Sequence, residues 1–159
     1  MGNSEVKAPA LDPAAVDVRL GSAYPEEFKP AAEGREKQAL GDAAGLTHYG
    51  VNLVRLKPGA GSALRHWHVH EDEFVYVLEG QLTLVTDAGE QVLGPGMAAG
   101  FPAGKADGHN VVNRSGEDAL YLEIGDRHPD EEVHYPDVDL HGRRIDGAFT
   151  FTRKDGSEV

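Results

Sequence analysis

The sequence predicts an all-β protein, built as an antiparallel sandwich or barrel. Between residues 46 and 126, short segments rich in β-branched and aromatic residues alternate with turns that contain Gly and Pro, at regular spacing. No segment in this region keeps a helical period. The chain has 159 residues, which is enough for one domain with a sizeable buried core.

Composition restricts the partners that we expect. The chain carries 15 Lys and Arg against 27 Asp and Glu, a net charge of −12. Such a charge opposes binding to phosphate backbones and anionic lipid, so we expect no nucleic-acid and no membrane partner. The absence of cysteine excludes disulfides and cysteine nucleophiles. Because we find no secretory signal and no apolar stretch that would span a bilayer, we expect a cytoplasmic protein.

The first 45 residues are predicted to form an N-terminal arm. They are rich in Ala, Pro, Gly and charge, and they contain few large apolar side chains. We expect the arm to dock on the barrel through Tyr24 and Phe28, with a short helical turn over residues 25–29 and partial disorder at its start. A flexible leader without a role is the alternative.

The β-rich segments follow in order. They are residues 48–57, 62–68, 74–78, 81–86, 91–93, 97–102, 109–113 and 119–125. After Gly125 the chain becomes polar, and residues 133–140 are predicted to be irregular. Residues 149–153 alternate and indicate one last strand, at a sheet edge or on a neighbouring subunit. The predicted division is therefore 1–45 arm, 46–126 barrel and 127–159 C-terminal extension.

Two imidazoles and a carboxylate are predicted to converge near the middle of the chain. His66 and His68 have the i, i+2 spacing that places both rings on one face of a strand. The four residues 69–72 suit a hairpin loop, after which Glu73 opens the return strand across from His68. This set of donors is typical of a site for a divalent metal.

Two motifs resemble those of the cupin superfamily. The first comprises His66, His68, Glu73 and Gly80 at the family spacing, although Ala60 stands where the family has a leading Gly. The second comprises Gly96, Pro102, Gly104, His109 and Asn113. Four residues rather than two separate Gly104 from His109, so this loop carries a two-residue insertion.

The resemblance implies a small single-domain cupin, folded as a double-stranded β-helix or jelly-roll barrel and associated as a homodimer. It also implies one divalent metal held by His66, His68, Glu73 and His109, with the insertion bearing on how His109 is aimed. Gly80, Gly96, Pro102, Gly104 and Asn113 would then serve as structural turn residues. Three imidazoles and a carboxylate suit Fe, Mn, Ni, Co or Zn and leave one or two positions open. A barrel without metal is the alternative.

Strand alternation predicts what surrounds the ion. If Glu73 points inward, so do Val75 and Val77, while the apolar side chains between them point outward. We expect a second subunit or the arm to cover that outer face, which consists of Phe74, Tyr76 and Leu78. The polar groups that would meet a ligand are Tyr49, Tyr121, Glu123 and Asp107.

Other polar and aromatic residues near the motif are expected to have no role in the site. We expect His70, Glu71 and Asp72 to lie in the loop, in contact with water, and Trp67 to pack away from the ligands. The remaining histidines fit no motif and are expected on the surface; they are His48, His128, His134 and His141.

The open coordination positions favour a metal-dependent enzyme that acts on a small polar metabolite. An isomerase or epimerase would use the ion as a Lewis acid, whereas an oxygenase would use iron. The sequence offers no unmistakable general acid or base. A non-catalytic binding or sensing module with a metal at its centre is therefore the alternative, and a metal-free storage barrel is a third.

Overall fold

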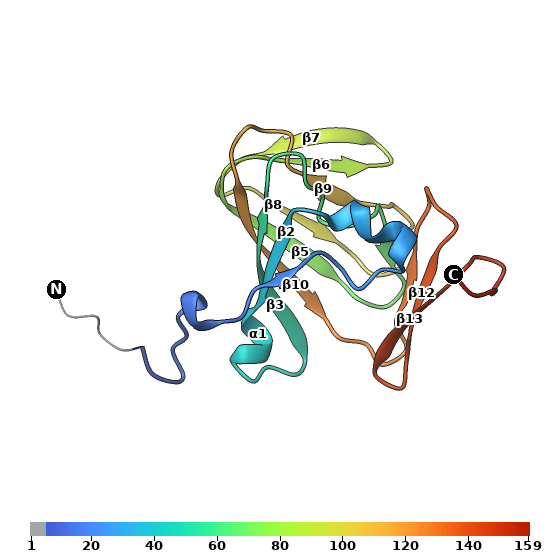
Figure 1. Cartoon of the computed structure of the whole chain (residues 1–159), viewed down its shortest axis with the longest axis horizontal. Coiled ribbons are helices and arrows are strands. Elements are labelled where there is room, and N and C mark those ends of the chain that lie inside the picture. Colours follow the sequence, from blue (N-terminus) through green and yellow to red (C-terminus); the bar gives the residue numbers. More distant parts are fainter. Residues whose placement is uncertain (1–5) are drawn as a thin grey trace.

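The computed structural model describes residues 6–159, and β-strands form most of its regular structure (Figure 1). The predicted disorder at the start of the arm falls in part on residues 1–5, which lie outside the described residues. None of the described helices is long and apolar enough to cross a membrane.

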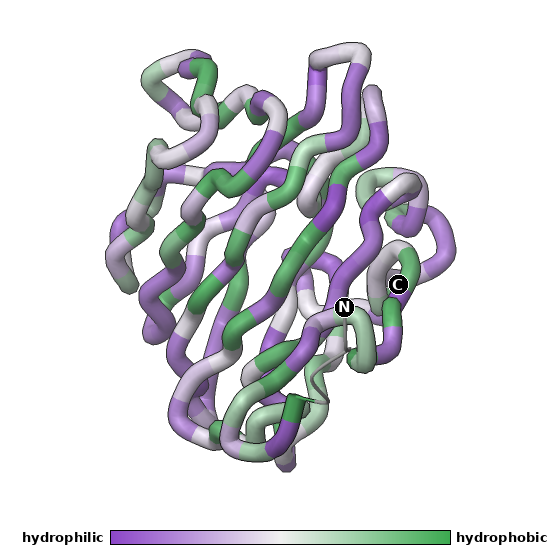
Figure 2. Tube along the Cα trace, turned by 90° about the vertical axis from the view of Figure 1, so that its left-hand side faces the viewer, coloured by the Kyte–Doolittle hydropathy of each residue, from purple (hydrophilic) through white to green (hydrophobic). Residues whose placement is uncertain are grey.

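The largest sheet has six antiparallel strands. Their order is β1 (Arg19–Leu20), β2 (Arg35–Ala39), β3 (Tyr49–Leu56), β10 (Ala119–Asp126), β5 (Glu73–Glu79) and β8 (Ala98–Phe101). β10 lies in the interior of this sheet, where it pairs with β3 on one side and with β5 on the other. Figure 2 shows these strands side by side, with hydrophobic and hydrophilic residues interspersed along them.

Two smaller sheets complete the fold. One contains β7 (Gly89–Leu93), β6 (Leu82–Thr86) and β9 (Asn110–Val112), at the top of Figure 1. The other contains β13 (Ala148–Thr152), β12 (His141–Ile145), β11 (Glu132–His134) and β4 (Trp67–His68). The predicted all-β class and the jelly-roll architecture are thus confirmed, with the strands distributed over three hydrogen-bonded sheets rather than one closed cylinder.

The main core lies between the large sheet and the β7-β6-β9 sheet. On β5 the side chains of Val75 and Val77 are buried, as alternation predicts, whereas Phe74, Tyr76 and Leu78 remain about two-fifths exposed. The other buried side chains come from both sheets and include Val54, Leu56, Leu82, Leu84, Leu93, Val111 and Tyr121. This core holds the strands that carry the candidate site.

The N-terminal arm is more ordered than its composition suggests. Residues 13–15 (η1, Pro13–Ala15) and residues 26–32 (η2, Glu26–Ala32) form 3₁₀ helices, the second of which confirms the predicted helical turn. The next strand, β2, pairs with β3, and a single α-helical turn (α1, Leu40–Ala43) follows it. Tyr24 and Phe28 do dock, but on the C-terminal part of the chain, where they pack with Val133, Tyr135 and Leu140.

Three predictions about strands were wrong. Residues 62–68 do not form one strand, since regular pairing covers only β4. β4 pairs with β11 rather than with β5, so the predicted hairpin around residues 69–72 does not exist. Residues 133–140 were expected to be irregular, yet the first two of them belong to β11. Each error has the same cause, which is that these short strands are fixed by partners distant in sequence. The last predicted strand is confirmed as β13, at the edge of its sheet.

Candidate metal centre

His66, His68 and Glu73 bring one ligand atom each within 4.8 Å of the others. The two oxygens of Glu73 divide between the rings: Oε2 lies 3.3 Å from His66 Nε2, and Oε1 lies 3.2 Å from His68 Nε2. His109 lies outside that group of three but also reaches the carboxylate, with its Nε2 2.6 Å from Glu73 Oε2. The structure therefore brings the three predicted imidazole ligands around the carboxylate of the fourth, Glu73.

These side chains arrive from facing sheets. His66 and His109 form an antiparallel bridge, in which each backbone N–H donates to the carbonyl of the other at 3.1 and 2.9 Å. Glu73 begins β5 in the large sheet, where it is paired with Phe101 and Gly125. Convergence across the barrel thus replaces the hairpin geometry that the sequence predicted.

Two contacts orient the rings. His66 Nδ1 lies 2.8 Å from the carbonyl of Leu64, which fixes the proton on Nδ1 and leaves the Nε2 lone pair directed toward Glu73. The ring of His109 stacks on Phe101 with a centroid distance of 3.6 Å. Both rings are therefore held in place before any ligand binds.

The donor set fits a divalent ion. An ion bound about 2.1 Å from each donor would place neighbouring donors of an octahedral set about 3.0 Å apart, close to the distances around Glu73. Both nitrogens of His68 and Nδ1 of His109 are buried without a hydrogen-bond partner among the described residues. Burial raises the pKa of Glu73, but His66, His109 and His68 outweigh it and hold that pKa well below its usual range. The carboxylate is therefore ionised and available to a cation.

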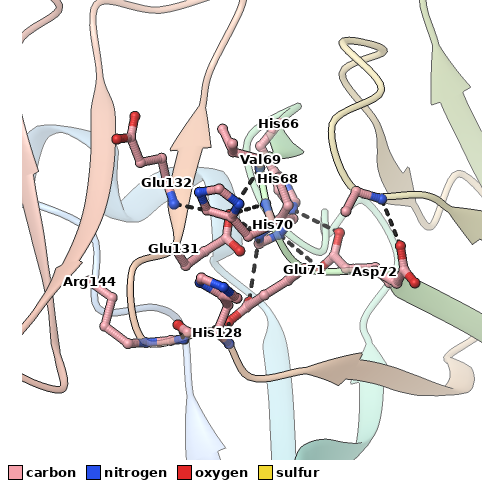
Figure 3. Close-up of polar contacts among 12 residues, drawn as sticks. His66, His68, Val69, His70, Glu71, Asp72, His128, Glu131, Glu132 and Arg144 are labelled. Atoms are coloured by element: carbon pink, nitrogen blue, oxygen red, sulfur yellow. Dashed lines mark hydrogen bonds and ion pairs between the residues drawn. The ribbon is translucent and has the colours of Figure 1, made fainter.

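Two buried carboxylates stand behind His68 (Figure 3). Oε1 of Glu131 lies 3.7 Å, and Oε2 of Glu71 lies 3.8 Å, from His68 Nδ1. Glu131 is fully buried, and its Oε1 accepts backbone N–H bonds from Val69, His70 and Glu132 at 3.0, 3.3 and 3.0 Å. Burial lowers the pKa of His68, but Glu73, Glu131 and Glu71 together raise it.

The prediction that Glu71 is solvated was wrong. Only 7% of Glu71 is exposed, because Arg144 donates to its Oε1 at 2.5 Å and the backbone N–H of His128 donates at 2.8 Å. Arg144 comes from β12, which the sequence did not predict. Sequence analysis also missed Glu131, because the polar run after Gly125 gave no sign of burial.

The other loop predictions agree with the structure. His70 is exposed and stacks on His128 at 4.5 Å, and Asp72 is exposed. Trp67 packs against the ring of His134 at a centroid distance of 4.4 Å, but it also lines a cavity beside His68 and His109, so its prediction is confirmed only in part. Residues 105–108, which include the two-residue insertion, form a loop in which Asp107 accepts the backbone N–H of Asp87 at 2.8 Å.

Two cavities of more than 200 Å³ border at least two residues of the cluster each. The first, which we call the tyrosine cavity, has a volume of about 240 Å³, and the residues that matter for its chemistry are Tyr24, Arg35, His66, His68, Glu73, Glu123 and Tyr135. The second, the loop cavity, has a volume of about 260 Å³ and includes His68, Thr86, Gln91, Phe101, Lys105, Asp107 and His109. His68 lines both cavities, so a ligand in either one lies beside the cluster.

The predicted pocket residues lie in different places in the structure. Glu123 lines the tyrosine cavity, and Tyr121 and Val75 border a small space of about 20 Å³ beside His66 and His109. Val77 is packed inside the core. Tyr49 lies in a separate outer groove with Phe74, although Glu73 also borders that groove.

The predicted turn residues occupy the connections between strands. Gly80 has φ +74°, and a Cβ there would lie 2.5 Å from the carbonyl oxygen of Asp118, so only glycine fits. Asn113 is fully buried and donates through Nδ2 to the carbonyls of Leu56 and Glu117 at 2.9 and 2.7 Å. The remaining turn residues are Gly96 and Gly104, with φ +85° and +75°, and Pro102.

A jelly roll with imidazoles and a carboxylate gathered at its centre defines a class of small β-proteins suited to metal binding. Comparison with known proteins identifies the family. The Cupin domain matches residues 52–125, and a cupin-superfamily structure, described below, is similar over nearly the whole chain. The chain belongs to the cupin superfamily.

Solved structures extend this comparison. The sugar phosphate isomerase from Silicibacter pomeroyi is 49% identical, with 95% of this chain and 96% of that chain covered and a TM-score of 0.92. A proposed sugar phosphate isomerase from Acidithiobacillus ferrooxidans is 34% identical over 79% of this chain and 80% of its own, with a TM-score of 0.71. The polyketide cyclase RemF from Streptomyces resistomycificus shares the fold, with a TM-score of 0.64. It is 23% identical, and 81% of this chain and 85% of that chain are covered. No match was found among the curated proteins.

Proposed function

We propose that this chain is a metal-dependent isomerase of a phosphorylated sugar, with one divalent ion held by His66, His68, Glu73 and His109. One observation carries the proposal: the cluster of imidazoles around Glu73 opens into a cavity that also holds Glu123. A second carboxylate beside a metal site is the group that proton transfer requires. The name of the Silicibacter pomeroyi relative supports the choice of substrate.

The ion, when bound, would supply Lewis-acid polarisation of the substrate carbonyl. Glu123 would take the proton from the hydroxyl-bearing carbon next to that carbonyl and return it to the former carbonyl carbon, while the proton of that hydroxyl passes to the former carbonyl oxygen. Aldose and ketose then interconvert without net gain or loss of atoms. Glu123 suits this role because its side chain is about one-quarter exposed and lines the tyrosine cavity, with its Oε2 3.9 Å from Lys37 Nζ.

Two tyrosines in the same cavity would orient the substrate. Burial raises the pKa of Tyr24 and of Tyr135, so both hydroxyls stay protonated at neutral pH. Protonated hydroxyls can donate hydrogen bonds to sugar oxygens. Arg35 has a supporting role, because its guanidinium donates to the carbonyls of Gly21 and Ser62 and thereby holds the cavity wall.

An anionic substrate is also favoured by the loop cavity. Lys105, from the loop that carries the two-residue insertion, lines this cavity together with His68 and His109. Within residues 6–159, no carboxylate lies close enough to Lys105 to form an ion pair. Lys105 is therefore our candidate for the side chain that attracts the phosphate group.

The test is an isomerisation assay of aldose and ketose phosphates with Mn, Fe, Co, Ni and Zn, followed by NMR. We expect product with at least one metal, and a loss of kcat of about 10²-fold or more in Glu123→Gln. Glu36→Gln, on β2 of the same sheet and outside both cavities near the cluster, is the matched control and should keep full activity.

Three outcomes separate the alternatives. Metal-loaded protein that isomerises no sugar phosphate would contradict the proposal. A sugar phosphate that raises thermal stability but is recovered unchanged would identify a binding module. Oxygen consumption by the iron form would identify an oxygenase.

We also propose that the protein is a cytoplasmic homodimer. The outer face of β5 supports the dimer, because Phe74, Tyr76 and Leu78 stay about two-fifths exposed and the described part of the arm does not bury them. The cysteine-free composition favours the cytoplasm.

A further inference from the structure

A second group of metal-binding side chains lies on the sheet formed by β13, β12, β11 and β4. Glu132 and His134 are two residues apart on β11, so they share a face. His141, on β12, is paired directly with His134. One ligand atom from each of the three residues lies within 4.8 Å of the others.

We propose that Glu132, His134 and His141 form a second metal site, which takes a borderline divalent ion such as Zn²⁺, Ni²⁺ or Cu²⁺. Two imidazoles and one carboxylate are a common protein donor set for zinc and leave a position for water. The site is distinct from the cluster around Glu73. On β11 and β4, Val133 and His68 are paired on the inner face, while His134 and Trp67 are paired on the opposite face.

Aromatic packing holds His134 in position. The indole of Trp67 stacks on the His134 ring with a centroid distance of 4.4 Å and an interplanar angle of 15°. The His141 ring lies on the other side of His134, with a centroid distance of 4.9 Å.

The carboxylate is arranged so that one oxygen remains available. Oε1 of Glu132 accepts a hydrogen bond from Arg143 at 2.8 Å. Oε2 lies 3.3 Å from His141 Nε2, a buried nitrogen that has no hydrogen-bond partner in the described part of the chain. The arginine thus fixes the carboxylate, and the other oxygen faces the two imidazoles.

Zinc stoichiometry tests the proposal. Metal-stripped full-length protein is dialysed against buffered Zn²⁺, and bound zinc is measured by mass spectrometry. We expect His134→Gln/His141→Gln to bind one equivalent fewer than the wild type. His48→Gln/His128→Gln removes the same number of imidazoles from elsewhere and should bind as much zinc as the wild type.

A second measurement separates the two sites. In His66→Gln/His109→Gln, which disables the centre around Glu73, zinc should still raise the unfolding midpoint by about 5 °C at saturation. Adding His134→Gln/His141→Gln should abolish that rise. Circular dichroism checks that each variant is folded. Unchanged zinc stoichiometry in folded His134→Gln/His141→Gln would overturn the proposal, whatever the centre around Glu73 binds.

Discussion

Arg144 is the residue whose contacts most constrain the surroundings of His68. Its guanidinium donates to Glu71 and to the carbonyl of His128, both at 2.5 Å (Figure 3). Glu71 is nearly inaccessible to solvent, so a substitution that removes the arginine leaves a buried carboxylate without its cation. Replacing Arg144 alone should therefore destabilise the fold, even though Arg144 is a polar residue.

We predict that Arg144→Met lowers the free energy of unfolding by about 3 kcal/mol, since breaking a buried ion pair from one side leaves an uncompensated charge. Chemical denaturation measures this difference. The double variant Glu71→Gln/Arg144→Met should recover more than half of the loss. A double variant that is less stable than Arg144→Met would contradict this account.

Residue patterns also mark the limit of sequence analysis. His66, His68, Glu73 and His109 were predictable as a set because fixed spacings connect them to turns. Glu71, Glu131 and Arg144 were not predictable, because their burial depends on β11 and β12. These two strands carry few apolar residues, and they lie far from Glu71 in the sequence. Whether the four side chains bind a metal stays a prediction.

At the scale of elements, the strands β3, β5, β6 and β10 were predicted well, because apolar alternation and Gly or Pro turns specify them locally. The C-terminal sheet was predicted only at β13, because β11 pairs with β4, which is distant in the sequence, and β12 carries few apolar residues. The arm was only partly predictable: β2 has the sequence Arg-Glu-Lys-Gln-Ala and becomes a strand through pairing with β3.

Arg65 connects three loops between strands. It binds Asp137 through Nε at 2.8 Å, contacts Asp87, and donates to the carbonyl of Gly108 at 2.8 Å. Its hydrogen bond to Asp137 holds the pKa of that carboxyl below its usual value. Because the folded pKa is depressed, the stabilisation is present above the ordinary pKa of about 3.8 and is lost as pH falls through the lower, folded value.

We predict that Asp137→Asn lowers the unfolding free energy at pH 7 by no more than about 1 kcal/mol, because the carboxylate is more than half exposed. The difference from the wild type should shrink as the pH falls below about 4. Thermal unfolding at a series of pH values measures it. A difference that grows on acidification would contradict the assignment.

At the scale of the whole molecule, one face of the large sheet is unusually apolar. Phe74, Tyr76 and Leu78 on β5 are joined by Met97, which is 48% exposed next to β8. A strand that is apolar on both faces is normally covered on both. The described residues cover only the inner face of β5.

We predict that light scattering of the full chain gives twice the mass of one chain. Tyr76→Lys/Leu78→Lys should shift the mass to that of a monomer, because two charges at the centre of an apolar interface remain unpaired. Val92→Lys, on the exposed face of β7, is the control and should leave the dimer intact. A wild-type monomer at all concentrations would contradict the predicted dimer.

The measurement that bears most directly on the central claim is the metal content of untagged wild-type protein beside His66→Ala and Glu73→Ala. Mass spectrometry of the purified proteins should find at least one transition-metal equivalent in the wild type and one equivalent fewer in each folded variant. The identity of the ion then distinguishes Lewis-acid chemistry from oxygen chemistry. Folded wild-type protein that neither contains metal nor takes it up on reconstitution would contradict the account.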